Sequence, residues 1–189
     1  MRKLVWDTSA IVKIKEPNQA GYSPAYGLLK DLSDGWIPGP YLNLFPALAI
    51  FEVSAAVSRR LREGHSILRE FYLLDENSRI YNVDDTLVLR SHDLFALPGF
   101  DQLRGADLVF ACIAHLEGAT LVTTDGAFQK HVGHSVDVLD LTESLAEPRY
   151  REHFQAQPGS DGAAEQGDEA DERWAYWTLA AYLQCSTLV

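Results

Sequence analysis

The sequence predicts an α/β domain whose mostly parallel sheet is covered by helices on both faces. Short apolar segments suited to buried strands alternate along the chain with segments whose apolar residues recur at helical spacing. Glycine and proline residues separate many of these segments. Two of the apolar segments lead directly to an aspartate, Asp7 and Asp125. Both aspartates are therefore expected at the carboxyl edge of the sheet, where open α/β sheets bind their ligands.

Five apolar segments are expected to form the strands. The first is a short buried strand that starts almost as soon as the chain begins, and the second forms either a strand or an extended lead-in to a helix. In chain order they are Lys3–Trp6, Tyr41–Phe45, Arg79–Val83, Ala119–Thr123 and Val136–Leu141. Because helical segments lie between them, a parallel arrangement is favoured over hairpins.

The helices are predicted from apolar spacing together with start and stop signals. Thr8 and Ser9 favour a turn or a helix start, Pro46 fits a first helical turn, and Gly118 closes the clearest amphipathic helix. The predicted helices are Tyr22–Leu32, Pro46–Arg62, His65–Glu76, Thr86–Ala96, Gly105–Glu117 and Ala127–His131. The second and third of these are expected to form a helical hairpin.

The chain is expected to contain one folded domain and a C-terminal extension. Residues 1–156 form the predicted domain, and residues 157–173 read as an acidic flexible linker because they contain no large apolar side chain. Residues 174–189 form an aromatic and apolar tail that can adopt a helix. This tail is shorter than the roughly 20 apolar residues of a membrane span, and the first residues lack the apolar run of an export signal. A soluble, cytoplasmic protein is expected.

The net charge of −11 argues against a polyanionic partner, but the charge is unevenly distributed. Residues 161–189 contribute −5 of it, through six acids and one base. If four acids of the remaining chain are metal ligands, bulk charge does not exclude nucleic acid. The two cysteines, Cys112 and Cys185, match no metal or redox spacing.

Four acids occupy positions where a solvated surface carboxylate is not expected. On a helix, Glu52 has Leu48, Ala49, Ala55 and Ala56 as neighbours, and Asp107 also lies among mostly apolar residues. Asp7 and Asp125 each follow a buried strand. Taken singly, each has a structural alternative: Glu52 could pair with Arg59 or Arg60, and the aspartates could cap helices or turns.

Together the four acids indicate a metal site. Carboxylates that converge raise one another's pKa, so the cluster needs a cation to stay ionised. Oxygen ligands without His or Cys indicate Mg²⁺ or Mn²⁺ rather than zinc. Such an ion can activate water for attack on a phosphodiester and neutralise charge on the phosphate.

Three segments that hold the four acids in order resemble the PIN-domain family, which includes the VapC-type toxin ribonucleases. They are Val5-Trp6-Asp7-Thr8-Ser9-Ala10, then "PALAIFEVSAAVSRR" with Glu52, and "GADLVFACIAHLEGATLVTTD" with Asp107 and Asp125. The resemblance covers roughly residues 3–141 and implies a three-layer α/β/α fold. It also implies a Mg²⁺- or Mn²⁺-dependent endoribonuclease, an antitoxin partner and a homodimer. Residues 13–45 are longer than in compact members, and nothing after about Phe154 has a counterpart.

The resemblance also implies roles for individual residues. Asp7 and Asp107 would be the principal metal ligands, Asp125 would complete the cluster, and Glu52 would bind metal or help to activate water. Thr123 would occupy a position where family members often have a hydroxyl residue. Thr8 or Ser9 could orient Asp7.

Two further expectations concern binding. The best basic patch for RNA phosphates is formed by Arg59, Arg60 and Arg62 together with Arg69. The alternative function is a PIN-like module that no longer cleaves and docks a partner protein, through the tail or the linker. A third possibility is that the acidic linker mimics RNA and covers the basic patch.

Overall fold

The computed structural model describes residues 1–14, 23–61, 77–142 and 149–155. Within them lies a five-stranded sheet of order β3-β2-β1-β4-β5, in which every pairing is parallel. The strands are β1 (Arg2–Trp6), β2 (Tyr41–Pro46), β3 (Ser78–Tyr81), β4 (Thr120–Thr123) and β5 (Val138–Asp140). The predicted parallel sheet is confirmed, and Tyr41–Pro46 is a strand rather than a lead-in.

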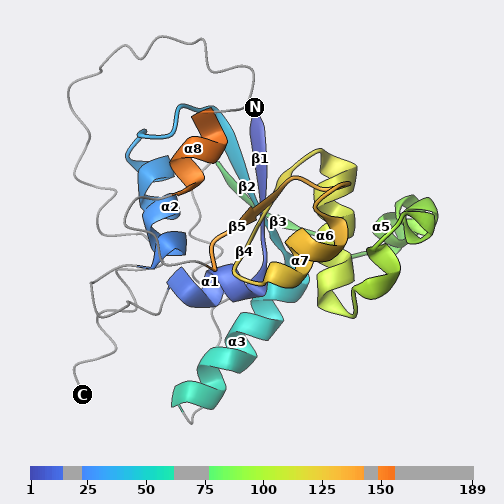
Figure 1. Ribbon diagram of the computed structural model, residues 1–189. Coiled ribbons are helices and arrows are strands. Elements are labelled where there is room, and N and C mark those ends of the chain that lie inside the picture. The colour runs from blue at the N-terminus through green and yellow to red at the C-terminus, as the bar shows by residue number, and fades with distance from the viewer. Residues whose placement is uncertain (15–22, 62–76, 143–148, 156–189) are drawn as a thin grey trace.

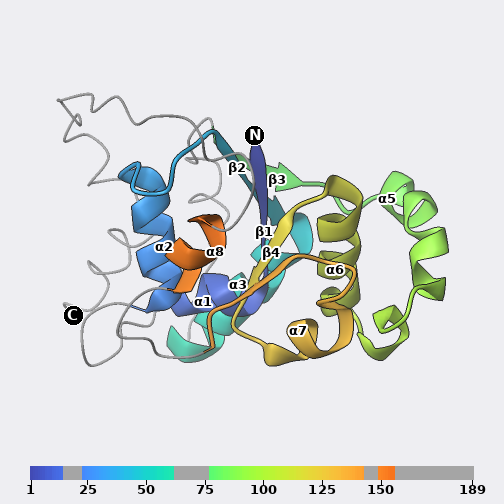
Figure 2. The same cartoon turned by 45° about the horizontal axis from the view of Figure 1, so that its top comes forward.

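The helices lie on both faces of the sheet, as the strand order requires. In chain order they are α1 (Thr8–Ile14), α2 (Pro24–Ser33), α3 (Ala47–Leu61), α5 (Asp85–Arg90), α6 (Ala106–Glu117), α7 (Gly126–Val132) and α8 (Arg149–Gln155). Figure 2 shows α1, α2 and α8 on one side of the sheet and α6 with α7 on the other. Three layers, α/β/α, result.

Strand β1 occupies the centre of the sheet and carries the largest buried side chain. Trp6 is fully buried, stacks on Phe45 at a ring distance of 6.1 Å, and donates its indole N–H to Asn43 Oδ1 at 2.9 Å. The apolar strand residues Leu4 and Val5 are also fully buried. Burying such side chains contributes about 1.5–3 kcal/mol each, so the first strand is firmly fixed within the core.

The order of the strands reverses next to β1, because the chain goes from β1 to β2 on one side and returns to β4 on the other. Such a reversal leaves a crevice at the carboxyl ends of the two strands. Asp7 follows β1 directly, and Asp125 follows β4 after one intervening residue. Figure 1 shows α1, α3 and α7 gathered at this end of the sheet.

Two predicted elements differ from the structure. The helix expected over Thr86–Ala96 is an α-helix only to Arg90 and continues as a 3-10 helix, η1, over His92–Ala96. The cause is an i→i+3 hydrogen bond from Leu94 N to Ser91 O at 3.0 Å, which tightens the turn after the α-helix has ended at Ser91. The strand predicted over Val136–Leu141 is shortened to β5, since its neighbour β4 offers only three paired positions.

Some predicted boundaries depend on glycine. Gly118 ends α6 in the left-handed region at φ 55°, as its position in the sequence predicted. Gly99, at φ 86°, precedes a second 3-10 helix, η2 (Phe100–Gln102), and a Cβ there would lie 1.8 Å from the His131 carbonyl oxygen. Only glycine therefore lets this loop pack on α7. The helix predicted over His65–Glu76 lies outside the described residues.

Candidate functional site

Asp7 is a buried carboxylate held by hydroxyl groups. Its side chain is 3% exposed, and Oδ2 accepts hydrogen bonds from Ser9 Oγ and, at 2.8 Å, from Thr123 Oγ1. Burial raises the pKa of Asp7 above its ordinary value, although these hydrogen bonds and those from the Thr8 and Ser9 backbone act in the opposite direction. Among the residues that the structure describes, no cationic side chain contributes to this shift.

The hydroxyl groups connect the carboxyl ends of β1 and β4. Thr123 Oγ1 accepts the Asp125 N–H at 2.9 Å while it donates to Asp7, and Ser9 Oγ accepts the Thr124 N–H at 3.0 Å. Ser9 and Thr123 also lie 3.3 Å apart through their oxygens. The two strand ends are thereby fixed relative to one another, which is the arrangement expected of groups that orient Asp7.

Glu52 reaches the same edge from α3. Its Oε2 accepts a hydrogen bond from Thr8 Oγ1, one residue after Asp7. Of the two arginines considered as alternative partners, Arg59 is exposed and forms no ion pair with Glu52, and the side chain of Arg60 lies outside the described part of the structure. The apolar stripe around Glu52 therefore directs the carboxylate toward β1.

Asp107, in the first turn of α6, lies within electrostatic range of the other three acids. Its pKa is raised, first by burial and then by the negative charges of Asp7, Asp125 and Glu52. These three acids come from segments separated by up to 118 residues in the sequence. Like charges have this effect only at short range, so the fold brings all four carboxylates into one neighbourhood.

Asp125 has the capping role that was considered as its structural alternative. It is the N-cap of α7, since its Oδ1 accepts the Ala127 N–H at 2.8 Å. Its charge nevertheless contributes to the raised pKa of Asp107. A cap of this kind uses one oxygen and fixes the orientation of the other, so capping does not exclude metal binding.

A fifth acid at this edge was missed by the sequence interpretation. Asp140 ends β5, pairs in register with Thr123, and places Oδ2 3.5 Å from the position that a Cβ on Gly126 would take. Its Oδ1 accepts the Thr142 N–H at 2.8 Å. The rule that located Asp7 and Asp125, an acid at the end of an apolar strand, also applies to Asp140.

The donors suit a hard divalent cation in kind. The cluster presents carboxylates and hydroxyls, which are ligands of Mg²⁺ and Mn²⁺, with neither histidine nor thiolate among them. In the described part of the chain, no three His, Cys, Asp or Glu side chains already stand close enough to hold one ion. Binding would therefore draw the carboxylates inward, with Asp7 as the fixed member because of its burial.

Of the arginines predicted to contact RNA phosphates, the structure describes the side chain of Arg59. Arg59 is exposed on α3, on the same helix as Glu52. The side chain of Arg60, and the whole of Arg62 and Arg69, lie outside the described residues. The basic patch of Arg59, Arg60, Arg62 and Arg69 for RNA phosphates therefore stays a prediction.

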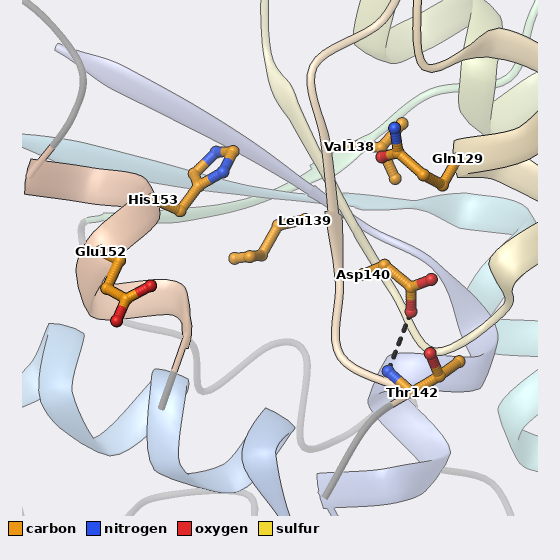
Figure 3. Close-up of a pocket in the computed structure, with 7 residues that line it drawn as sticks. All are labelled: Gln129, Val138, Leu139, Asp140, Thr142, Glu152 and His153. Carbon is orange, nitrogen blue, oxygen red and sulfur yellow. Dashed lines mark hydrogen bonds between the residues drawn. The ribbon is translucent and has the colours of Figure 1, made fainter. Parts of the chain in front are cut away.

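A pocket of about 430 Å³ lies beside the edge strand β5 rather than at the four acids. It is lined by Gln129, Val138, Leu139, Asp140, Thr142, Glu152 and His153 (Figure 3). Asp140 is the member nearest to the acid cluster, because β5 ends beside β4. None of the four predicted acids lines this pocket, so the chemistry is assigned to the carboxyl edge and not to the pocket.

No helix in the described part of the chain combines the length and apolar character needed to cross a membrane.

Solved structures that match this chain include the following two. A toxin–antitoxin complex from Klebsiella pneumoniae matches with 18% identity and a TM-score of 0.50, covering 75% of this chain and 99% of the other. The VapC20 toxin of Mycobacterium tuberculosis, described as cleaving the sarcin–ricin loop, matches with 17% identity and a TM-score of 0.48, covering 67% and 93%.

No curated protein sequence matches the chain. The profile of the PIN domain, however, matches residues 4–133. That match covers more than half of the chain and includes β1, the helices α3 and α6, and the four predicted acids. The fold, the order of the motifs and the profile agree, and the chain belongs to the PIN domain family.

Proposed function

We propose that this protein is a divalent-metal-dependent endoribonuclease whose site is formed by Asp7, Glu52, Asp107 and Asp125. One observation carries the proposal: burial, and after it the charges of Asp7, Asp125 and Glu52, raise the pKa of Asp107 at the carboxyl edge of the sheet. Four like charges gathered at a ligand-binding sheet edge oppose folding unless a cation offsets them. Membership of the PIN domain family and the oxygen-only donors support the same conclusion.

Each residue has a role that follows from its surroundings. Asp7, buried and fixed by Ser9 and Thr123, would anchor Mg²⁺ or Mn²⁺, and Asp107 and Asp125 would complete the ligand set. When held by these residues, the ion would supply a water of lowered pKa and would neutralise charge on the scissile phosphate. Glu52 binds Thr8 through Oε2, which leaves Oε1 to accept a proton from the attacking water.

The proposal is tested by RNA cleavage with purified full-length protein and Mg²⁺ or Mn²⁺. Asp7→Asn removes the anchoring charge at almost constant volume, and it should abolish cleavage while the circular dichroism spectrum stays unchanged. The matched control is Asp93→Asn, which changes an exposed acid of η1 outside the cluster. Full activity of Asp7→Asn, or of the wild type in excess chelator, would contradict the proposal.

We further propose that the enzyme is the toxin of a toxin–antitoxin pair that acts on cytoplasmic RNA as a homodimer. The motif resemblance to VapC-type toxins motivates this step. Expression of the wild type should arrest growth, Asp7→Asn should not, and a small protein encoded beside the gene should restore growth by binding the toxin. Arrest by Asp7→Asn to the same extent would instead favour the alternative, a non-cleaving PIN-like module that acts by binding a partner.

A further inference from the structure

A second, mostly apolar pocket has none of the four acids in its lining. It has a volume of about 210 Å³ and is lined by Trp36, Ile37, Pro38, Arg151, Phe154 and Gln155. Trp36 is 72% exposed, which is unusual for the largest apolar side chain. The pocket forms where the segment between α2 and β2 meets the end of α8, two elements that lie side by side in Figures 1 and 2.

A buried polar atom next to this pocket lacks a partner. The Arg2 guanidinium lies 5.5 Å from the ring centre of Phe154, a residue of the pocket. Its Nη1 is buried and has no hydrogen-bond partner among the described residues. A buried donor without an acceptor is costly, and more so when it carries charge. The spot therefore suits an acidic group that the described part of the chain does not provide.

The chain itself leads out of this pocket. Gln155, the last described residue, is one of the pocket residues, and residues 156–189 follow it. Residues 161–172 contain six acids, and residues 174–183 contain Trp174, Tyr176, Trp177, Leu179, Tyr182 and Leu183. A flexible chain of about 18 residues spans roughly 23 Å on average, so the aromatic part can return to its starting point.

We propose that residues 174–183 fold back into the pocket beside Trp36 and Phe154 of the same chain, and that an acid of residues 161–172 accepts a hydrogen bond from Arg2 Nη1. Burial of the aromatic side chains drives the contact, and the opposite charges set its orientation. Attachment through a linker of about 18 residues gives an effective concentration on the order of 1 mM, which favours the tail of the same chain over that of a second copy.

This docking leaves the acid site open. Arg2 begins β1, whereas Asp7 follows its end, so the pocket and the four acids lie toward opposite ends of the central strand. The tail in this position does not cover the carboxyl edge. The inference does not depend on the proposed nuclease activity, and it differs from the expectation that the acidic linker covers the RNA-binding patch.

The test is a cross-link in the full-length protein, because Cys185 lies two residues beyond Leu183 and Cys112 is only 3% exposed. Pro38→Cys places a thiol in the pocket, and Leu89→Cys places one on α5, where the side chain is 76% exposed. A short bismaleimide should join Cys185 to the pocket thiol within one chain, several-fold more than to the control thiol. Equal yields, or cross-links only between chains, would overturn the proposal.

A second variant tests what holds the tail. Trp177→Ala, made in the Pro38→Cys protein, removes one aromatic side chain of the proposed docking segment, and an unchanged circular dichroism spectrum would show that the variant is folded. The cross-link yield should fall several-fold, and Arg2→Gln should lower it as well. An unchanged yield in Trp177→Ala would show that the aromatic residues do not anchor the tail and would reject the proposal. Because the readout is position and not cleavage, it is independent of nuclease activity.

Discussion

The two ends of helix α6 carry acids in opposite electrostatic surroundings. Glu117, in the last turn, accepts hydrogen bonds from Lys3 Nζ at 2.7 Å and Tyr81 Oη at 2.9 Å, and Arg90 lies at 3.3 Å. These partners lower its pKa. Asp107, in the first turn, faces three carboxylates, and its pKa is raised. Ten residues, or roughly 15 Å of helix, separate the two acids.

The difference separates an acid whose charge is balanced by cations from one that we propose as a metal ligand. Glu117 has two cations and a phenol, so its negative charge joins β1, β3 and α6 and contributes to stability. The cluster around Asp107 has hydroxyl partners but no cationic one among the residues that affect its pKa. Carboxylates with perturbed pKa values at a ligand-binding sheet edge are candidates for a functional site, which supports the proposed metal site.

The largest expected effect is on activity and separates the two ends of α6. Asp107→Asn should lower the rate of RNA cleavage by about 10³-fold, because a metal-bound site supplies several kcal/mol and each 1.36 kcal/mol is a factor of ten. Glu117→Gln is the matched control and should keep the rate within about twofold. Initial rates at saturating Mg²⁺ measure both. Equal losses of cleavage rate in the two variants would show that Asp107 has no specific role in cleavage.

A smaller effect is expected from the hydroxyl that orients Asp7. Thr123→Val removes the donor to Asp7 Oδ2 and leaves the Asp125 N–H without its acceptor. Loss of one such bond costs about 1–3 kcal/mol, so cleavage should slow by about tenfold while some activity remains.

The control for the hydroxyl variant is Thr120→Val, on the same strand, whose hydroxyl donates to Asp137 at 2.6 Å away from the acids. Its stability can fall, but its cleavage rate, measured well below the unfolding temperature, should not. A rate loss in Thr120→Val equal to that in Thr123→Val would assign both effects to the fold.

At the other end of α6 the effect should be on stability. Glu117→Gln should lower the free energy of unfolding by about 1–2 kcal/mol, measured by urea denaturation at neutral pH, since Lys3 and Arg90 lose their common partner. Because the folded-state pKa of Glu117 is lowered, its contribution is present above its ordinary pKa of 4.5 and disappears as the pH falls through the lowered value. The difference between variant and wild type should shrink accordingly in acid.

The smallest effect has the opposite sign. In metal-free protein, Asp107→Asn should raise the thermal unfolding midpoint at neutral pH, because the substitution removes a carboxylate that three others repel. The folded-state pKa of Asp107 is raised, so the folded chain holds this proton more tightly than the unfolded chain does. The penalty therefore appears as the pH rises through that raised value and is absent below the ordinary value of 3.8. An unchanged midpoint at neutral pH would show that the cluster carries no repulsion.

The sequence predicted the central sheet well because β1 and β4 are short apolar runs with no competing pattern. It predicted the four acids for a related reason: a carboxylate after a buried strand, or inside an apolar helical stripe, conflicts with its local surroundings. Asp140 escaped because it lies inside the strand that was predicted to reach Leu141, and only the short β4 shows where that strand ends.

Other features depend on contacts that no local pattern contains. The transition from α5 to η1 depends on one tightened turn at Ser91. Helix α8 follows the last strand with little apolar periodicity, and Phe154 is buried with the Arg2 guanidinium over its ring. The orphan donor of Arg2 was likewise invisible, since a basic residue at the start of a chain is usually solvated.

The most direct test of the central claim is a calorimetric titration of Mn²⁺ into the wild type, Asp107→Asn and Glu117→Gln at neutral pH. If the four carboxylates form one divalent-metal site, Mn²⁺ should bind to the wild type and to Glu117→Gln with similar affinity. Asp107→Asn should lose most of the binding, and its thermal midpoint should no longer rise with added metal. Equal binding to Asp107→Asn, or no binding to the wild type, would contradict the account.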